Sequence, residues 1–153
     1  MKIIFLDYDG VVNTLWFQDV NGEPDFNFPK HDRVNNTQAI AWLNKLCRET
    51  EARIVVTSTW RMDDNYKECL YNAGLNKNIE ILGKTDNLGT RRGIEIQKWL
   101  DDNKSLNIES FVILDDDKDM EHLVNHLVST NTFIGISYID YEKAKQILMP
   151  EQN

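Results

Sequence analysis

Three apolar segments of this 153-residue chain are each followed at once by side chains that can do chemistry. Grouped by segment, those side chains are Asp7 with Asp9, Thr57 with Ser58, and Asp115 with Asp116. Four carboxylates gathered at one place disfavour each other's ionisation unless a cation neutralises them. Magnesium suits such a set, because it is held by one or two carboxylates together with water and phosphate oxygens. The pattern therefore predicts a magnesium site that handles a phosphorylated substrate.

Each group near the first segment has a physical role in phosphoryl transfer. Asp7 can attack phosphorus as a carboxylate nucleophile. Asp9 can protonate the leaving oxygen and later deprotonate the hydrolytic water. Gly10 allows a tight turn, so we expect its amide to face a phosphate oxygen. The hydroxyl of Thr57 is expected to hydrogen-bond the phosphoryl group.

A fixed cation must also offset the charge on the equatorial phosphoryl oxygens. Arg92 or Arg91, at the start of an expected helix, is the candidate.

Alternating strands and helices must position these groups. Short apolar runs predict strands at 2–7, 54–56, 79–82, 111–114 and 133–136. Apolar residues spaced by three and four predict helices at about 36–50, 62–73 and 90–103 and around Met120 to Leu127, and we expect Asp140 to cap a last helix. Gly74 is expected to end the second helix.

The fold class that follows is α/β, with a mainly parallel five-stranded sheet and helices on both faces. Ligands bind beyond the carboxyl ends of the strands in such sheets, where the reactive side chains fall. With no linker, repeat or low-complexity tract, we expect residues 1–153 to form a single domain. Asn21-Gly22 between aromatic residues predicts a small flap over about 13–35.

The composition of the chain limits the kinds of partner that we expect it to bind. The chain is 41% hydrophobic and 27% charged, with no apolar run near the length of a membrane span, and the short apolar run after Met1 does not resemble a signal peptide. We therefore expect a cytoplasmic location and no membrane partner. The net charge of −8 argues against broad non-specific nucleic-acid binding.

Three segments together resemble motifs of the haloacid dehalogenase (HAD) superfamily, in the family's order. Asp7 to Val12 resembles the first motif, Ile54 to Ser58 the second, and Phe111 to Asp116 the fourth. A narrower resemblance, to the HAD domain of Swiss Army Knife RNA repair proteins, rests on Thr57 to Arg61, Arg92 to Leu100, and Asp115 to Met120. Together the motifs frame most of the chain.

The resemblance implies a three-layer, Rossmann-like fold and a phosphatase that works through a phosphoaspartate. Asp7 would be phosphorylated, Asp9 would be the acid/base with its carbonyl on the metal, and Thr57 would bind the phosphoryl group. Asp115 would complete the magnesium site, with Asp116 close behind. The third motif departs from the usual lysine: Arg92 takes its place here, and Lys84 is a rival.

The resemblance implies that a cap domain would be inserted after the first motif or between the second and the third. The short spacings at both places leave a site that is capless apart from the flap. By analogy an open site suits a nucleotide, a nucleic-acid end or another bulky phosphomonoester. We expect Gly10, Ser58, Trp60 and Arg61 to contact that substrate, and Trp16, Phe17 and Trp60 could stack on a nucleobase.

Two alternatives remain open. One is a catalytically idle HAD-like binding module. The other is a receiver-like signalling module, although in receivers the phosphorylated aspartate follows a later strand than the first.

Overall fold

The computed structural model describes residues 1–14 and 37–151. Its centre is a five-stranded sheet in which all the pairings are parallel, in the order β3-β2-β1-β4-β5. The strands are β1 (Lys2–Leu6), β2 (Arg53–Val56), β3 (Ile81–Lys84), β4 (Ser110–Asp115) and β5 (Leu127–Ser129). The first strand of the chain is therefore the middle strand of the sheet.

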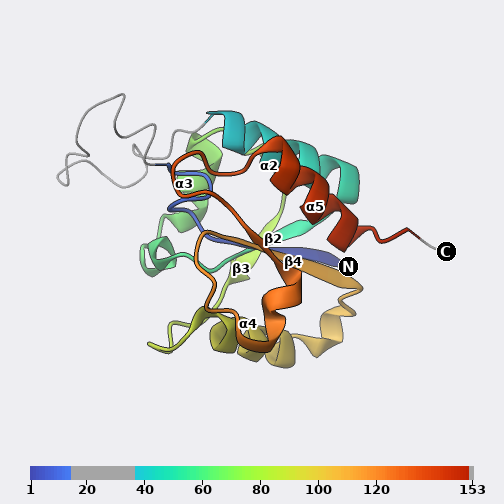
Figure 1. The fold of residues 1–153 in the computed structure, drawn as a ribbon. Helices are drawn as coiled ribbons and strands as arrows, with labels where there is room; N and C mark the ends of the chain where they lie inside the picture. The colour runs from blue at the N-terminus through green and yellow to red at the C-terminus, as the bar shows by residue number, and fades with distance from the viewer. Residues whose placement is uncertain (15–36, 152–153) are drawn as a thin grey trace.

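Helices cover both faces of the sheet (Figure 1). One face carries α2 (Thr37–Thr50), α3 (Tyr66–Asn72) and α5 (Tyr138–Leu148), and the other carries α4 (Arg92–Asp102). Short 3-10 turns are η2 (Thr59–Met62), η3 (Lys104–Leu106) and η4 (Glu121–His126). This is the α/β, three-layer, Rossmann-like fold that the sequence predicts.

Alternate residues of the buried strands supply two separate cores. In β1, Ile4 and Leu6 pack with α2, α3 and α5, whereas Ile3 and Phe5 pack towards α4. Side chains of a strand point to opposite faces in turn, so a strand covered on both sides must be apolar throughout. The unbroken Ile3–Leu6 run, with all four side chains fully buried, meets that requirement.

The last strand is not where the sequence predicts it. Residues 133–136 form no strand, and Phe133 and Ile134 are exposed. Strand β5 is instead Leu127–Ser129, and the helix expected around Met120 to Leu127 is the 3-10 turn η4. Buried Met120 and Leu123 are three residues apart, a spacing that also fits 3-10 geometry, and an edge strand of three residues leaves little periodic signal.

Other boundaries also differ from the prediction: the strand expected at 79–82 is β3, Ile81–Lys84. The segment 62–73 is not one helix: η2 ends at Met62 and α3 begins at Tyr66. The cap of α5 is Ser137, whose side chain accepts from the amide of Asp140, while the Asp140 carboxylate accepts from the Ser137 amide in return. Gly74, with φ 110°, follows the last turn of α3 as predicted.

The predicted flap and the aromatic residues Trp16 and Phe17 lie outside the described residues, apart from Asn13 and Thr14. Within residues 1–14 and 37–151, no helix has the length and apolar character needed to cross a membrane.

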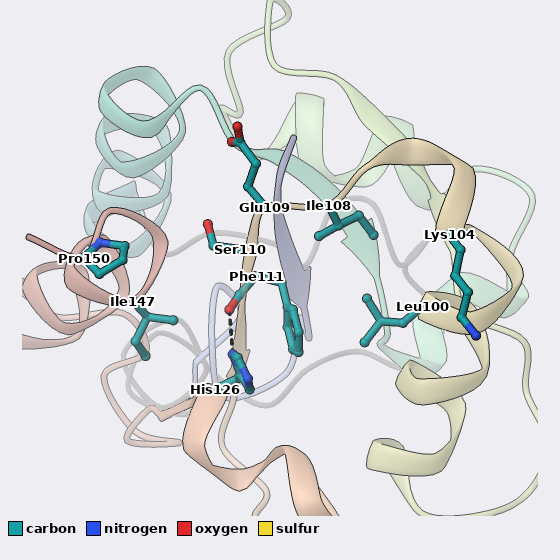
Figure 2. A pocket seen from close by; sticks show the side chains of 9 residues that line it. All are labelled: Leu100, Lys104, Ile108, Glu109, Ser110, Phe111, His126, Ile147 and Pro150. Atoms are coloured by element: carbon teal, nitrogen blue, oxygen red, sulfur yellow. Dashed lines mark hydrogen bonds between the residues drawn. The ribbon is translucent and has the colours of Figure 1, made fainter. Parts of the chain in front are cut away.

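A hollow of about 480 Å³ opens beside the start of β4. Figure 2 shows Phe111 and His126 on its wall, with the His126 ring hydrogen-bonded to the Phe111 carbonyl oxygen at 3.1 Å. Ser110 lines this hollow, whereas Asp115 ends the same strand. The hollow therefore lies at the opposite edge of the sheet from the aspartates.

Candidate active site

Strand register brings the reactive side chains to one level. Leu6, the last residue of β1, pairs with Val56 of β2 on one side and Leu114 of β4 on the other. The next residues, Asp7, Thr57 and Asp115, therefore leave three adjacent strands together. Two backbone bonds fix the alignment: the Asp7 amide donates to Leu114 at 3.0 Å, and the Thr57 amide donates to Leu6 at 2.9 Å.

Three carboxylates converge at this edge. Asp7, Asp115 and Asp116 each offer an oxygen, and these oxygens all lie within 4.8 Å of one another. Burial raises the pKa of Asp7 to about 6. Burial and the neighbouring Asp7 raise the pKa of Asp115 to about 7. The cluster therefore resists full ionisation at neutral pH unless positive charge is added.

The donor set fits a hard divalent cation. Asp115 Oδ2 is buried and has no hydrogen-bond partner among the described residues, although it lies 3.6 Å from Arg92 Nη1. A buried carboxylate oxygen ordinarily has a hydrogen-bond partner or a metal. Oxygen ligands from two or three carboxylates match the preference of magnesium.

Arg92, at the first position of α4, supplies the protein's own positive charge at the cluster. Its Nη1 lies 3.3 Å from Asp7 Oδ1 and also donates to the Thr57 carbonyl oxygen. Although burial opposes its charge, Asp115 and Asp7 raise the pKa of Arg92 above its ordinary value. The loop after β4 holds this end of α4, because the Asp119 carboxylate accepts from the Arg92 amide at 3.0 Å.

The two rival cations point elsewhere. Arg91 is exposed and pairs with Glu121 at 2.8 Å. Lys84 donates to the carbonyl oxygen of Arg61 at 2.8 Å, and its ammonium lies 5.0 Å from the ring centre of Tyr66. The geometry thus places Arg92, and neither rival, against the nucleophile candidate.

Two hydroxyl residues, Thr57 and Ser58, follow β2 at the level of Asp7. Ser58 is buried, and its hydroxyl group lowers the pKa of the Asp7 carboxyl, which favours the ionised form of that group. Thr57 Oγ1 is buried and has no hydrogen-bond partner among the described residues. A hydroxyl left in that condition is available to a ligand oxygen.

Gly10 serves a different purpose from the one expected. Its amide, expected to face a phosphate oxygen, donates instead to the carbonyl oxygen of Asn13 at 2.7 Å. The residue has φ 77°, and a Cβ there would lie 2.2 Å from Asp116 Oδ2. Only glycine adopts this positive φ without strain and has no Cβ to clash with Asp116, so glycine at this position permits the close approach of the Asp116 carboxylate.

Asp9 stands at the exposed side of the site and is held by two donors. Asn13 Nδ2 donates to Asp9 Oδ1 at 2.7 Å, and Trp60 Nε1 donates to Asp9 Oδ2 at 3.1 Å. Trp60 is only 5% exposed, so its ring faces are covered in this structure.

Arg61 turns inward. Its guanidinium pairs with Glu95 at 2.7 Å and also donates to the Thr57 carbonyl oxygen, and both members of the pair are 4% exposed.

Sequence reasoning did not single out Glu95, Asn13 or Asp119. The available signal for Glu95 and Asp119 was their place in the segments Arg92 to Leu100 and Asp115 to Met120, which carry the narrower resemblance. Asn13 had no signal that would distinguish it from an ordinary turn residue.

The family model that matches this chain is described as the HAD domain in Swiss Army Knife RNA repair proteins, and the match spans residues 3–140. The chain belongs to this family. No curated protein and no solved structure shows a significant match to this chain.

Membership in the HAD family supports an enzyme of the hydrolase or phosphatase type, acting in general on a phosphorylated substrate. HAD proteins generally use Mg²⁺, and the aspartate cluster described above is one that could bind it. The match contains all three strand ends and Arg92.

Proposed function

We propose that this chain is a magnesium-dependent phosphomonoester hydrolase that works through a phosphoaspartate on Asp7. The observation that carries the proposal is the convergence of Asp7, Asp115 and Asp116 within 4.8 Å beside the guanidinium of Arg92. A nucleophile, a cation site and a fixed positive charge are what transfer of a phosphoryl group requires.

Asp7, Asp115 and Asp116 would hold the ion, together with the Asp9 carbonyl that the family resemblance implies. The ion supplies positive charge that offsets the phosphoryl oxygens and keeps the carboxylates ionised. Arg92 contributes a second positive charge, and the free hydroxyl of Thr57 orients the phosphoryl group. Both are fixed before substrate arrives, so little reorganisation is needed.

The reaction has two steps. In the first, an oxygen of Asp7 bonds to phosphorus as the bond to the leaving oxygen breaks, and Asp9 gives that oxygen a proton. In the second, Asp9 takes a proton from water, whose oxygen bonds to phosphorus and releases the Asp7 carboxylate with inorganic phosphate. Asp9 ends each cycle protonated again.

Arg61 supports the site from behind in this scheme. Because its guanidinium is buried against Glu95 and the Thr57 carbonyl oxygen, it orients the residues after β2. A direct contact between Arg61 and substrate stays a prediction.

The proposed substrate is a nucleotide or a nucleic-acid end. The matched family is described from RNA repair proteins, which supports a phosphorylated end. The net charge of −8 disfavours binding along a nucleic-acid backbone, so we propose recognition of a terminus rather than of a long tract.

Hydrolysis of para-nitrophenyl phosphate, with and without Mg²⁺, tests the proposal on wild type and Asp7→Asn. We expect Mg²⁺-dependent release of phosphate that Asp7→Asn abolishes and that Asp64→Asn, at an exposed aspartate, retains. Oligonucleotides phosphorylated at the 3′ or 5′ end then test the substrate class. No turnover on either kind of substrate, together with no Mg²⁺ binding, would favour an idle binding module.

A further inference from the structure

Asp9 is an exposed carboxylate with both oxygens already engaged. Asn13 Nδ2 bonds Oδ1 at 2.7 Å, and Trp60 Nε1 bonds Oδ2 at 3.1 Å. An exposed aspartate ordinarily samples several rotamers in water. Two donors that come from different segments, the turn after β1 and η2, restrict Asp9 to one orientation of its carboxylate plane.

Trp60 is rigidly placed. Its ring centre lies 5.6 Å from that of Tyr8, with 56° between the planes, and its amide donates to Ser58 Oγ at 3.3 Å. The Tyr8 hydroxyl in turn donates to the carbonyl oxygen of Tyr66 at 2.6 Å, at the start of α3. The indole N–H therefore has little freedom to follow Asp9 if the carboxylate moves.

Asn13 is placed just as firmly. It is 4% exposed. Its backbone N–H donates to the Tyr8 carbonyl oxygen at 2.8 Å, and its backbone carbonyl oxygen accepts from the Gly10 N–H at 2.7 Å. The turn from Tyr8 to Asn13 is thus closed by backbone bonds on both sides of Asp9.

We infer that Trp60 and Asn13 are positioning residues that aim the Asp9 carboxyl group at the leaving-group oxygen. The inference rests on the acid/base role proposed for Asp9. A carboxylate has about four lone-pair sites, so two N–H donors leave sites free for the transferred proton. That proton passes from Asp9 to the leaving oxygen as the phosphorus–oxygen bond breaks, and Trp60 and Asn13 keep their own protons throughout.

The test compares leaving groups. Trp60→Phe removes the indole N–H and keeps an aromatic ring against Tyr8. Phenolate, whose conjugate acid has a pKa of about 10, needs a proton on departure, whereas dinitrophenolate leaves as a stable anion. Since general acid catalysis typically contributes about 10²–10⁴-fold, we expect kcat/KM to fall roughly tenfold or more with phenyl phosphate and only slightly with dinitrophenyl phosphate.

A purely structural role would lower kcat/KM equally for both substrates, and that result would overturn the inference. Trp99→Phe is the matched control, because Trp99 packs edge-on against Phe5 at 5.4 Å on the α4 side of the sheet. Trp99→Phe should leave the ratio of the kcat/KM values for the two substrates unchanged. Asn13→Ala removes the other donor, so we expect the same selective loss of kcat/KM with phenyl phosphate. This variant carries the test if Trp60→Phe folds poorly.

A readout independent of turnover checks the contact itself. In NMR spectra, the indole N–H resonance of Trp60 should shift in Asp9→Asn, while those of Trp42 and Trp99 should not. An unmoved Trp60 resonance would contradict the contact. If wild type hydrolyses nothing, the proposed function fails and the role of Trp60 fails with it, even where the resonance shift is seen.

Discussion

Arg61 and Glu95 form an ion pair 2.7 Å long, and both side chains are almost completely buried. Glu95 also accepts from the amide of Leu88 at 2.9 Å, and Arg61 donates to the carbonyl oxygen of Thr57. The pair thus joins α4 and the loop before it to the end of β2.

Removing one partner should be costly, because it leaves a buried charge without compensation. We expect Glu95→Ala to lower the free energy of unfolding by about 3–5 kcal/mol, as breaking buried pairs does. Glu80→Ala removes an exposed partner of Arg53 and should cost no more than about 1 kcal/mol. Urea unfolding of both variants measures the difference, and equal losses would argue against the buried pair as a stabilising link.

Arg92 should matter for rate far more than its neighbour. Arg92→Ala removes the charge beside Asp7, and loss of one such fixed donor typically lowers kcat by about 10²–10³-fold. Arg91→Ala, at an exposed pair with Glu121, should stay close to wild type. Steady-state kinetics at saturating Mg²⁺ compare the two; similar losses would return Lys84 to consideration.

Gly10 should not tolerate even alanine. Its left-handed backbone costs a side chain about 1–2 kcal/mol, and the new Cβ would displace Asp116. Gly89, with φ 64° and open space around it, provides the control with similar backbone strain. We expect Gly10→Ala to weaken Mg²⁺ binding, measured by calorimetry, and Gly89→Ala to leave it intact.

Stability without metal should fall as pH rises from about 4 to about 7. Asp7 and Asp115 have pKa values of about 6 and about 7 in the folded protein, against 3.8 ordinarily. At these two groups the folded state therefore binds more protons than the unfolded state in this window, so their titration favours unfolding as the pH rises.

Mg²⁺ should oppose that loss, because it binds the ionised carboxylates. We expect the increase in Tm on adding Mg²⁺ to grow between about pH 5 and about pH 8. Thermal unfolding in chelator and in Mg²⁺ measures it. An increase that is the same at both pH values would mean that these carboxylates are not the ligands.

The meeting of Asp7, Thr57 and Asp115 could be anticipated from the sequence, because all three follow apolar strands and parallel strands end at one edge. The identity of the third-motif cation could not. Lys84 and Arg92 both lie near that edge, and only the direction of each side chain separates them.

The sequence also does not reveal which side chains contact each other across long separations in the chain. Glu95 pairs with a residue 34 positions away, and Trp60 bonds one 51 positions away. Periodicity describes a segment's own faces, not the group that a folded neighbour will present. The strand at Leu127–Ser129 was missed for a related reason, since pairing with β4 selects it rather than its own composition.

The alignment of Leu6 with Val56 and Leu114 has a consequence for how activity is acquired during folding. These strands lie far apart in the chain, so their pairing closes long loops and is expected to be slow. Once they are aligned, Asp7, Thr57 and Asp115 are neighbours without any further rearrangement. Recovery of activity after dilution from denaturant should therefore follow formation of the central three strands and coincide with the packing of α4, which brings Arg92 to Asp7.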